Sequence, residues 1–288
     1  MRIRAKHSAA LASALVIALA GAARAEPDLD AKLVINGDLE MTTIAPAPAH
    51  LEGALGDNVI SGWHYRDAAT RQMETDDFEN PAMSAVDEAL AAWDTVDGSE
   101  GKSCADCHGA IEEGMKGVTA VLPKVTEAGA LWSAEDFIND CRTNRMGAEA
   151  WDWDKDPMKN MTAAIALQSR GMPVNVAIDG AAAPFWEQGK EMYYTRYGLL
   201  QLSCANCHEQ NNGNYIRADH LSQGQINGFP VFRLKNDGLV SIHNRFAGCV
   251  RDTRAETFSK GGPEFHALEL YVASRGNGLA VEGPSVRP

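Results

Sequence analysis

Two copies of one short motif, Cys-x-x-Cys-His, constrain this chain more than any other feature. They span residues 104–108 and 204–208 and begin 100 residues apart. Two cysteines at this spacing can form thioether bonds to the two vinyl groups of one porphyrin, and the histidine that follows then lies under the iron. The sequence therefore predicts two covalently bound haem c groups. The attachment cysteines are Cys104, Cys107, Cys204 and Cys207, and the proximal ligands are His108 and His208. A zinc or disulfide site is the less economical interpretation, because neither explains a histidine after each cysteine pair.

The first 25 residues have the pattern of a secretory signal peptide. Basic residues precede a short apolar run at 9–21, and an A-x-A cleavage site ends at Ala25. We therefore expect a periplasmic protein whose mature chain begins at Glu26. No segment approaches the roughly 20 apolar residues that a membrane helix needs, so we expect no membrane span.

The net charge excludes some classes of partner. The whole chain has a net charge of −13, and cleavage would remove four basic residues and no acidic ones, which lowers this charge to about −17. Such a surface binds neither nucleic acid nor acidic lipid, but it can steer a basic protein. An anionic substrate would need a local basic pocket.

Shorter similar segments occur around both motifs in the same order, which indicates an internal duplication. They are Trp93 and Trp186 before the motifs, then Leu122-Pro123 and Phe229-Pro230, Cys141 and Cys249, and the tripeptides Ser169-Arg170-Gly171 and Ser274-Arg275-Gly276. The fold prediction is a mainly α protein with two tandem cytochrome c-like domains related by duplication. After the signal peptide (1–25) come an N-terminal extension (26–77), a first domain (78–176) and a second, catalytic domain (177–288).

Each domain should contain a helix with the haem motif at its end, a loop with a proline, a short helix, and a C-terminal helix that packs across the first. In the first domain, the short helix covers 136–141 after Ser133 as N-cap. The C-terminal helices cover 158–167 and 265–272, and the first helix of the second domain lies around 184–198. We expect the acidic run 74–79 to be a solvated face and 231–240 to form a small hairpin.

The sixth iron ligand is less constrained. After Met192 the chain has no methionine, so the candidates in the second domain are His220, His243, His266 and Cys249. In the first domain Cys141 competes with Met115, Met146, Met158, Met161 and Met172. Cys141 and Cys249 hold matching places in the repeat, which favours thiolate ligation of each iron. A Cys141–Cys249 disulfide, the usual expectation in an oxidising compartment, is the alternative.

Two arginines flank Cys249. Arg245 stands four residues before it and Arg251 two residues after it. Guanidinium groups stabilise a thiolate and bind oxyanions through paired hydrogen bonds. The sequence leaves two roles open for Arg245, which are substrate binding and pairing with a haem propionate.

These residues resemble the SoxA family, the dihaem subunits of the SoxAX cytochrome of bacterial thiosulfate oxidation. The resemblance covers nearly the whole mature chain and includes the segment 70–81 and both haem motifs. Its specific part is Arg-x-x-x-Cys, ending at Cys249, 41 residues after His208. The resemblance implies His/Cys ligation of both haems, by His108 with Cys141 and by His208 with Cys249. It also implies that Cys249 is the catalytic residue, found as a persulfide, and that Arg245 holds the substrate.

The function implied by this resemblance is that of an L-cysteine S-thiosulfotransferase. Thiosulfate is conjugated oxidatively to a cysteine of the SoxYZ carrier protein. Two electrons pass through haem to the monohaem cytochrome SoxX, the partner in a heterodimer, and then to a small cytochrome c. The main alternative is a plain periplasmic dihaem electron-transfer cytochrome without substrate chemistry. A dihaem peroxidase and a haem-based sensor are further alternatives.

Overall fold

Helices dominate the computed structural model, which describes residues 26–288. The predicted signal peptide, residues 1–25, lies outside the described residues. The strands form five small sheets of two or three strands each. The mainly α class predicted from the sequence is confirmed. Within residues 26–288 no helix is both long and apolar enough to cross a bilayer.

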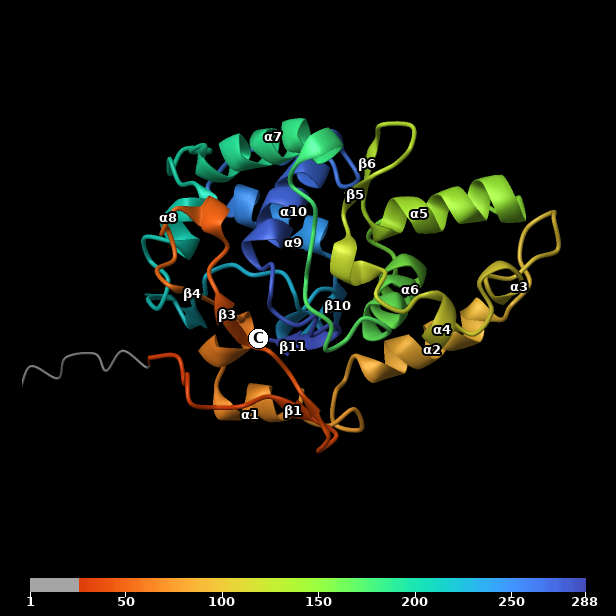
Figure 1. Cartoon of the computed structure of the whole chain (residues 1–288), viewed down its shortest axis with the longest axis horizontal. Helices are drawn as coiled ribbons and strands as arrows, with labels where there is room; N and C mark the ends of the chain where they lie inside the picture. Colours follow the sequence, from red (N-terminus) through yellow and green to blue (C-terminus); the bar gives the residue numbers. More distant parts are fainter. Residues whose placement is uncertain (1–25) are drawn as a thin grey trace, which may run out of the picture.

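The elements of the chain are arranged as Figure 1 shows. The helices are α1 (Ala68–Gln72), α2 (Met83–Trp93), α3 (Ala105–His108), α4 (Ile111–Gly114), α5 (Ala134–Cys141), α6 (Asp156–Leu167), α7 (Ala183–Tyr194), α8 (Cys204–His208), α9 (Ile242–Asp252) and α10 (Pro263–Arg275). The strands are β1 (Val34–Ile35), β2 (Leu39–Glu40), β3 (Ile44–Pro46), β4 (Asn58–Ile60), β5 (Lys124–Val125), β6 (Leu131–Trp132), β7 (Tyr215–Ile216), β8 (Asp219–His220), β9 (Val231–Arg233), β10 (Gly238–Val240) and β11 (Ser285–Arg287). Single turns of 3-10 or π-helix occur at Ala49–Leu51, Gly62–Tyr65, Thr119–Val121, Arg142–Met146, Gly180–Ala182 and Leu234–Asn236.

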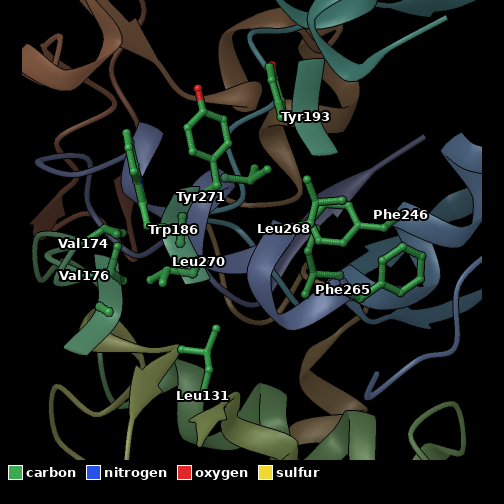
Figure 2. Close-up of a cluster of buried hydrophobic side chains, with 14 of the residues drawn as sticks. Leu131, Val174, Val176, Trp186, Tyr193, Phe246, Phe265, Leu268, Leu270 and Tyr271 are labelled. Atoms are coloured by element: carbon green, nitrogen blue, oxygen red, sulfur yellow. The ribbon is translucent and has the colours of Figure 1, made fainter. Parts of the chain in front are cut away.

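The α7–α10 pair forms the centre of the C-terminal half. A Cβ atom at Gly189 of α7 would lie 2.0 Å from the carbonyl oxygen of Ala267 in α10, so the two backbones can approach this closely only at a glycine. Aromatic rings surround the crossing, with the centroids of Tyr193 and Tyr271 5.2 Å apart (Figure 2). The Phe246 ring of α9 joins the same cluster and fixes α9 against α10.

The α2–α6 pair has the same place in the N-terminal half. Val86, Ala89 and Trp93 of α2 belong to one buried cluster with Met161 and residues 163–165 of α6. The C-terminal helix of each half therefore packs against the first helix of that half, as predicted. Burial of these apolar faces stabilises the pairs at roughly 25 cal/mol for each Å² of apolar surface removed from water.

Several local contacts recur at an interval of 100 residues. Gly98 and Gly198 both have positive φ, and a Cβ atom at either would lie 2.2 Å from a carbonyl oxygen, that of Met146 or that of Thr253. Trp93 takes the place that Tyr193 takes at the end of α7. The sequence suggested Trp186 as the equivalent of Trp93, but Trp186 lies one turn into α7. The two tryptophans therefore do not hold equivalent positions.

Most of the predicted elements are confirmed. Ser133 is the N-cap of α5, the two C-terminal helices are present, and β9 pairs antiparallel with β10 in the predicted hairpin. Each haem motif stands at the end of a helix, as predicted, since α3 ends at His108 and α8 ends at His208. A loop separates α2 from α3 and α7 from α8, so each motif has a short helix of its own.

The N-terminal extension packs against the C-terminal half of the chain. The amide nitrogen of Ile60 donates to Oε1 of Gln223 over 2.8 Å, and the His50 ring lies edge-on to Trp186 at 5.6 Å. The acidic run 74–79 is the expected solvated face only in part, because Asp76 and Glu79 are exposed and Asp77 is half-buried. Glu74 is buried and forms an ion pair with Arg287 of β11. This ion pair offsets the free-energy cost of burying a charged carboxylate.

Candidate functional site

Each haem motif lies on a short helix. Ser203 caps α8 by accepting from the amide nitrogen of Asn206, and Asp106 accepts from the amide nitrogen of Ser103 in the first motif. A single turn places residues three and four apart on one helix face. The two cysteines and the histidine of each motif therefore point to one side. Figure 1 shows α3 and α8 at opposite ends of the molecule, so the two motifs form two separate sites.

The imidazole of His208 is held in one tautomer. Its Nδ1 atom lies 2.8 Å from the carbonyl oxygen of Ser222, to which only an N–H can donate. The Nε2 atom then carries the lone pair and is the atom that can bind iron, as in many metal-binding histidines. Gly224 backs the same ring, because a Cβ atom there would lie 2.7 Å from Cγ of His208.

Cys249 lies beside the second motif. It stands on α9, whose N-cap is Ser241, and its charge acts on both Cys204 and Cys207. Burial first, and then Cys249, raise the pKa of Cys204 to about 12. The structure thus brings together the three cysteines that the sequence assigns to the second haem.

Arg245 lies four residues before Cys249 and therefore on the same face of α9. The charge of Cys249 is the main cause that raises the pKa of the Arg245 guanidinium, and burial opposes it. The guanidinium remains cationic beside the thiol and can neutralise a thiolate or an incoming anion.

Cys141 lies beside the first motif. It ends α5, eight residues after the N-cap Ser133, just as Cys249 stands eight residues after Ser241. Burial, and then the charge of Cys107, raise the pKa of the Cys141 thiol. A cavity of about 390 Å³ opens next to this motif, and its wall includes Cys104, Met146 and Trp151.

The disulfide alternative is not supported by the structure. All six cysteines are free, and Cys141 and Cys249 lie near different motifs rather than near each other. A zinc site is not supported either, since residues 26–288 contain no group of three or more His, Cys, Asp or Glu side chains placed to hold a metal ion.

The competing axial candidates of the second half have other partners. His220 lies 3.2 Å from the carbonyl oxygen of Gly213, His243 binds Glu269 at 3.0 Å, and His266 binds Asp136 at 2.6 Å. In the first half, Met115, Met158 and Met161 are core residues, Met172 packs against the core of the other half, and Met146 lines the cavity. Cys249 is thus the candidate left for the second site, whereas Met146 still competes with Cys141 for the first.

Three further charged residues near Arg245 were not identified from the sequence. Arg66, Arg233 and Asp219 all act electrostatically on one another or on Arg245. Arg66 comes from the N-terminal extension and pairs with Asp219 at 3.2 Å. Burial is the main cause that lowers the pKa of Arg66 and of Arg233, and the nearby guanidinium groups add to it. No local sequence signal marks these residues, because the tertiary fold alone brings them together.

The residues present fit haem c. Two cysteines and a histidine on one short helix are the residues that haem c attachment uses, and the fixed tautomer of His208 and the space left by Gly224 suit an iron-binding ring. The first motif offers the same residue types beside a cavity.

A comparison with known protein families supports the haem type. The family model described as "SoxA/TsdA, cytochrome c domain" matches residues 88–174. This match supports haem c as the cofactor, and the matched range falls within the first predicted domain.

Curated relatives match nearly the whole chain. The L-cysteine S-thiosulfotransferase subunit SoxA of Rhodovulum sulfidophilum is 61% identical over 259 residues, which are 90% of each chain. The SoxA subunit of Paracoccus pantotrophus is 58% identical over 279 residues, which are 96% of each chain. A solved chain of SoxXA from P. pantotrophus superposes with a TM-score of 0.88 at 58% identity, covering 90% of this chain and 99% of that one.

Proposed function

The chain belongs to the SoxA family, and from this premise we propose that it joins thiosulfate to a cysteine of the SoxYZ carrier as an L-cysteine S-thiosulfotransferase subunit. The observation that carries the proposal is the pairing of Cys249 with Arg245 on one face of α9, beside the second haem motif. A plain electron-transfer cytochrome needs no cationic side chain placed against such a thiol.

The proposal includes two haem groups in two domains related by duplication. It is supported by the Cys-x-x-Cys-His helices, by the glycines Gly98 and Gly198 in the same backbone environment, and by cysteines eight residues after the N-caps of α5 and α9. The domains are those predicted, 78–176 and 177–288, preceded by the extension 26–77.

We assign the axial ligands as His108 with Cys141 and His208 with Cys249. Bound haem would supply an electron acceptor whose potential is lowered by thiolate ligation. The chain's own residues attach the macrocycle through the four motif cysteines and fix the proximal ring, for which the His208–Ser222 hydrogen bond is the direct support.

The reaction balances as an oxidation that releases two electrons. The terminal sulfur of Cys249, as thiolate or as persulfide, bonds to the sulfane sulfur of thiosulfate, and two electrons leave. The thiolate of the carrier cysteine then attacks that sulfane sulfur, and the bond to Cys249 breaks. The carrier now holds an S-thiosulfonate group and Cys249 is regenerated. The one proton released comes from the carrier thiol.

Arg245 acts as an electrostatic clamp in this proposal. Thiosulfate carries two negative charges and the chain is acidic overall, so a local cation must offset the repulsion. Arg66 and Arg233 add to this local positive charge, and only Asp219 opposes it among the three neighbours found above.

The proposed partners are a SoxX monohaem cytochrome in a heterodimer, the SoxYZ carrier, and a small cytochrome c as final electron acceptor. The superposed structure is that of SoxXA, which supports the first of these partners. We also propose export to the periplasm through residues 1–25, where haem c attachment and thiosulfate chemistry can both take place. Amino-terminal sequencing of the exported protein should begin at Glu26.

The test is Cys249→Ser in the exported dihaem protein. We expect thiosulfate-dependent cytochrome c reduction to be lost while two haems per chain remain attached, as measured by haem stain and by absorbance of the pyridine complex. Retained turnover in this variant would show that Cys249 is a ligand only, and the electron-transfer alternative would then stand.

A further inference from the structure

The imidazole of His266 is buried where α10 of the C-terminal half meets α5 of the N-terminal half. Its Nδ1 atom lies 2.9 Å from the carbonyl oxygen of Gly262, and its Nε2 atom lies 2.6 Å from Oδ2 of Asp136. The same Oδ2 atom also accepts from the amide nitrogen of Ser133, as an ionised carboxylate does. Carbonyl and carboxylate oxygens only accept hydrogen bonds, so both ring nitrogens of His266 carry a proton. The geometry therefore makes this ring a buried imidazolium.

The neighbouring ring of His243 in α9 has a different arrangement. Its Nδ1 atom accepts from the amide nitrogen of Gly261 over 3.0 Å, so its proton is on Nε2, which lies 3.0 Å from Oε2 of Glu269. The two imidazoles are edge-on to one another, with centroids 5.2 Å apart. The positive charge of this pair of histidines therefore belongs to His266.

Carboxyl groups from both halves face the imidazolium. Burial lowers the pKa of His266, but the hydrogen bond and charge of Asp136, together with the charge of Glu269, raise it above the usual value. Glu135 of α5 also acts on the ring, whereas Glu264 lies beside Gly262 at the start of α10. The remaining groups at this junction are Trp153, whose ring is edge-on to His266 at 5.5 Å, and the Lys260–Asp154 ion pair. The cation thus offsets several buried carboxylates at once.

One face of α10 holds the first turns of both helices that carry a candidate axial cysteine. His266 and Glu269 are three residues apart and lie on the same face. His266 binds Asp136, which completes the capping box of α5. Glu269 accepts from the N-cap residue Ser133 of α5 and from His243 of α9. The position of the Cys141 helix relative to the C-terminal half therefore depends on the His266–Asp136 ion pair.

We propose that His266 is a pH-dependent link between the two halves, which holds the Cys141 helix while the ring is protonated and releases it when the ring loses a proton to solvent. Deprotonation would direct a nitrogen lone pair at an acceptor, either Asp136 or Gly262, and would remove the cation from a buried acidic junction. Because folding raises the pKa of this histidine, the stabilisation is fully present below about pH 6.5 and is lost as the pH rises through the raised value. The link itself is independent of the function proposed above, and only its effect on a haem ligand rests on that proposal.

The test compares Glu135→Gln with the double variant Glu135→Gln/His266→Gln in the mature dihaem protein. Glu135 is replaced in both because its pKa, raised to about 8 by burial and by Glu269, also depends on the charge of His266. Glutamine at 266 can still donate a hydrogen bond but is neutral at every pH. Denaturant titrations between pH 6 and pH 9 measure the unfolding equilibrium constant of each protein. We expect the ratio of the two constants to fall with rising pH, about tenfold for each unit by which the pKa of His266 is raised.

His50→Gln in the same Glu135→Gln background is the matched control. Burial first, and then the charge of Arg275, lower the pKa of His50. The control ratio should therefore change in the opposite sense between pH 6 and pH 7 and stay constant above pH 7. Asp136→Asn removes the same ion pair from its other side, and it should show the trend of His266→Gln if that variant does not fold.

The low-temperature EPR spectrum measures the release of the Cys141 helix. We expect the signal of the first haem to differ between pH 6 and pH 9 in Glu135→Gln, and to have its high-pH form at both values in the double variant. Ratios that stay constant from pH 6 to pH 9 would overturn the link. A pH-dependent ratio with an unchanged signal of the first haem would overturn the release of the helix. Loss of thiosulfate oxidation in the wild type would instead count against the proposed function and would leave the unfolding result unaffected.

Discussion

The Nδ1 atom of His208 lies 2.8 Å from the carbonyl oxygen of Ser222. This contact makes Nδ1 the protonated ring nitrogen and directs the lone pair of Nε2 away from the backbone. Hydrogen bonds of this kind orient a metal-binding imidazole and raise its basicity. The ring is also packed from behind by Gly224, so its position depends on two neighbours that lie outside the haem motif in the sequence.

The first prediction concerns the packing of this ring. In Gly224→Ala the new Cβ atom would lie 2.7 Å from Cγ of His208, at a φ of +78°. We expect the imidazole to be displaced, so that the second haem is attached poorly or is high-spin, while the first haem is unaffected. Haem stoichiometry and the low-temperature EPR spectrum measure this result.

Gly213→Ala is the matched control for the first prediction. Gly213 has nearly the same φ, +79°, but a Cβ atom there would meet nothing within 4 Å. The control should lose about 1 kcal/mol from the backbone conformation and keep both haems. Equal haem loss in the two variants would mean that backbone strain, and not contact with His208, is the cause.

The second prediction concerns a buried carboxyl group where α5 meets α10. Burial, and then the Glu269 carboxylate, raise the pKa of Glu135 to about 8. The group has a pKa of about 4.3 when unfolded, so folding favours its protonated form. The resulting contribution to stability is fully present below about pH 4 and is lost as the pH rises through 8.

Glu135→Gln keeps the volume and remains neutral at every pH. Between pH 5 and pH 9 we therefore expect the free energy of unfolding of the wild type to fall relative to this variant by about 3 kcal/mol. Denaturant unfolding at the two pH values measures it, with Glu127→Gln on an exposed loop as the control. A difference that does not change with pH would contradict the assignment of a neutral Glu135.

Local features of the sequence predicted the haem motifs, the N-cap Ser133, the hairpin at 231–240 and the placement of Cys141 and Cys249. The motifs, the cap and the hairpin depend on residues close together in the chain, such as a cap and the first turn of its helix. The two cysteines were placed by their matching positions in the internal repeat. The sequence did not reveal Arg66 near Arg245 or the burial of Glu74, because only the tertiary fold brings the extension against the C-terminal half. The pairing of Trp186 with Trp93 was wrong for a related reason. Chemical similarity suggested that the two tryptophans are equivalent, but packing at the helix crossing places Tyr193 at the position equivalent to Trp93.

The third prediction concerns the ion cluster that attaches the extension. Arg287 pairs with Glu74 and also with Glu282, whose Oε2 lies 3.0 Å from Nη2 of the arginine. Arg287→Ala leaves the buried carboxyl groups of Glu74 and Glu282 without their cation, although the amide nitrogen of Val286 still donates to Glu74. Loss of one partner of a buried ion pair typically costs about 3–5 kcal/mol. We expect a loss of this size in the free energy of unfolding, measured by denaturant titration.

Lys32→Ala is the exposed counterpart. The Lys32–Glu40 pair has a close contact of 2.7 Å, but its side chains are 70% and 61% exposed. Such pairs contribute about 0–1 kcal/mol, so this variant should unfold almost as the wild type does. If both variants lost the same small amount, the buried cluster would not be what holds the extension in place.

The fourth prediction concerns the crossing of α7 and α10. Alanine is favoured over glycine inside a helix by about 1 kcal/mol, so helix propensity alone predicts that Gly189→Ala stabilises the protein. The new Cβ atom, however, would lie 2.0 Å from the carbonyl oxygen of Ala267, and backbone atoms on both sides cannot move apart without disrupting the core. We expect the free energy of unfolding to fall by about 2 kcal/mol or more, measured by denaturant unfolding of the dihaem protein.

Gly248→Ala is a suitable helical control, since the nearest atom to its Cβ would be Nη2 of Arg251 at 3.8 Å. That variant should be neutral or slightly more stable. If Gly189→Ala behaved in the same way, the two helices would not be packed as closely as the structure shows.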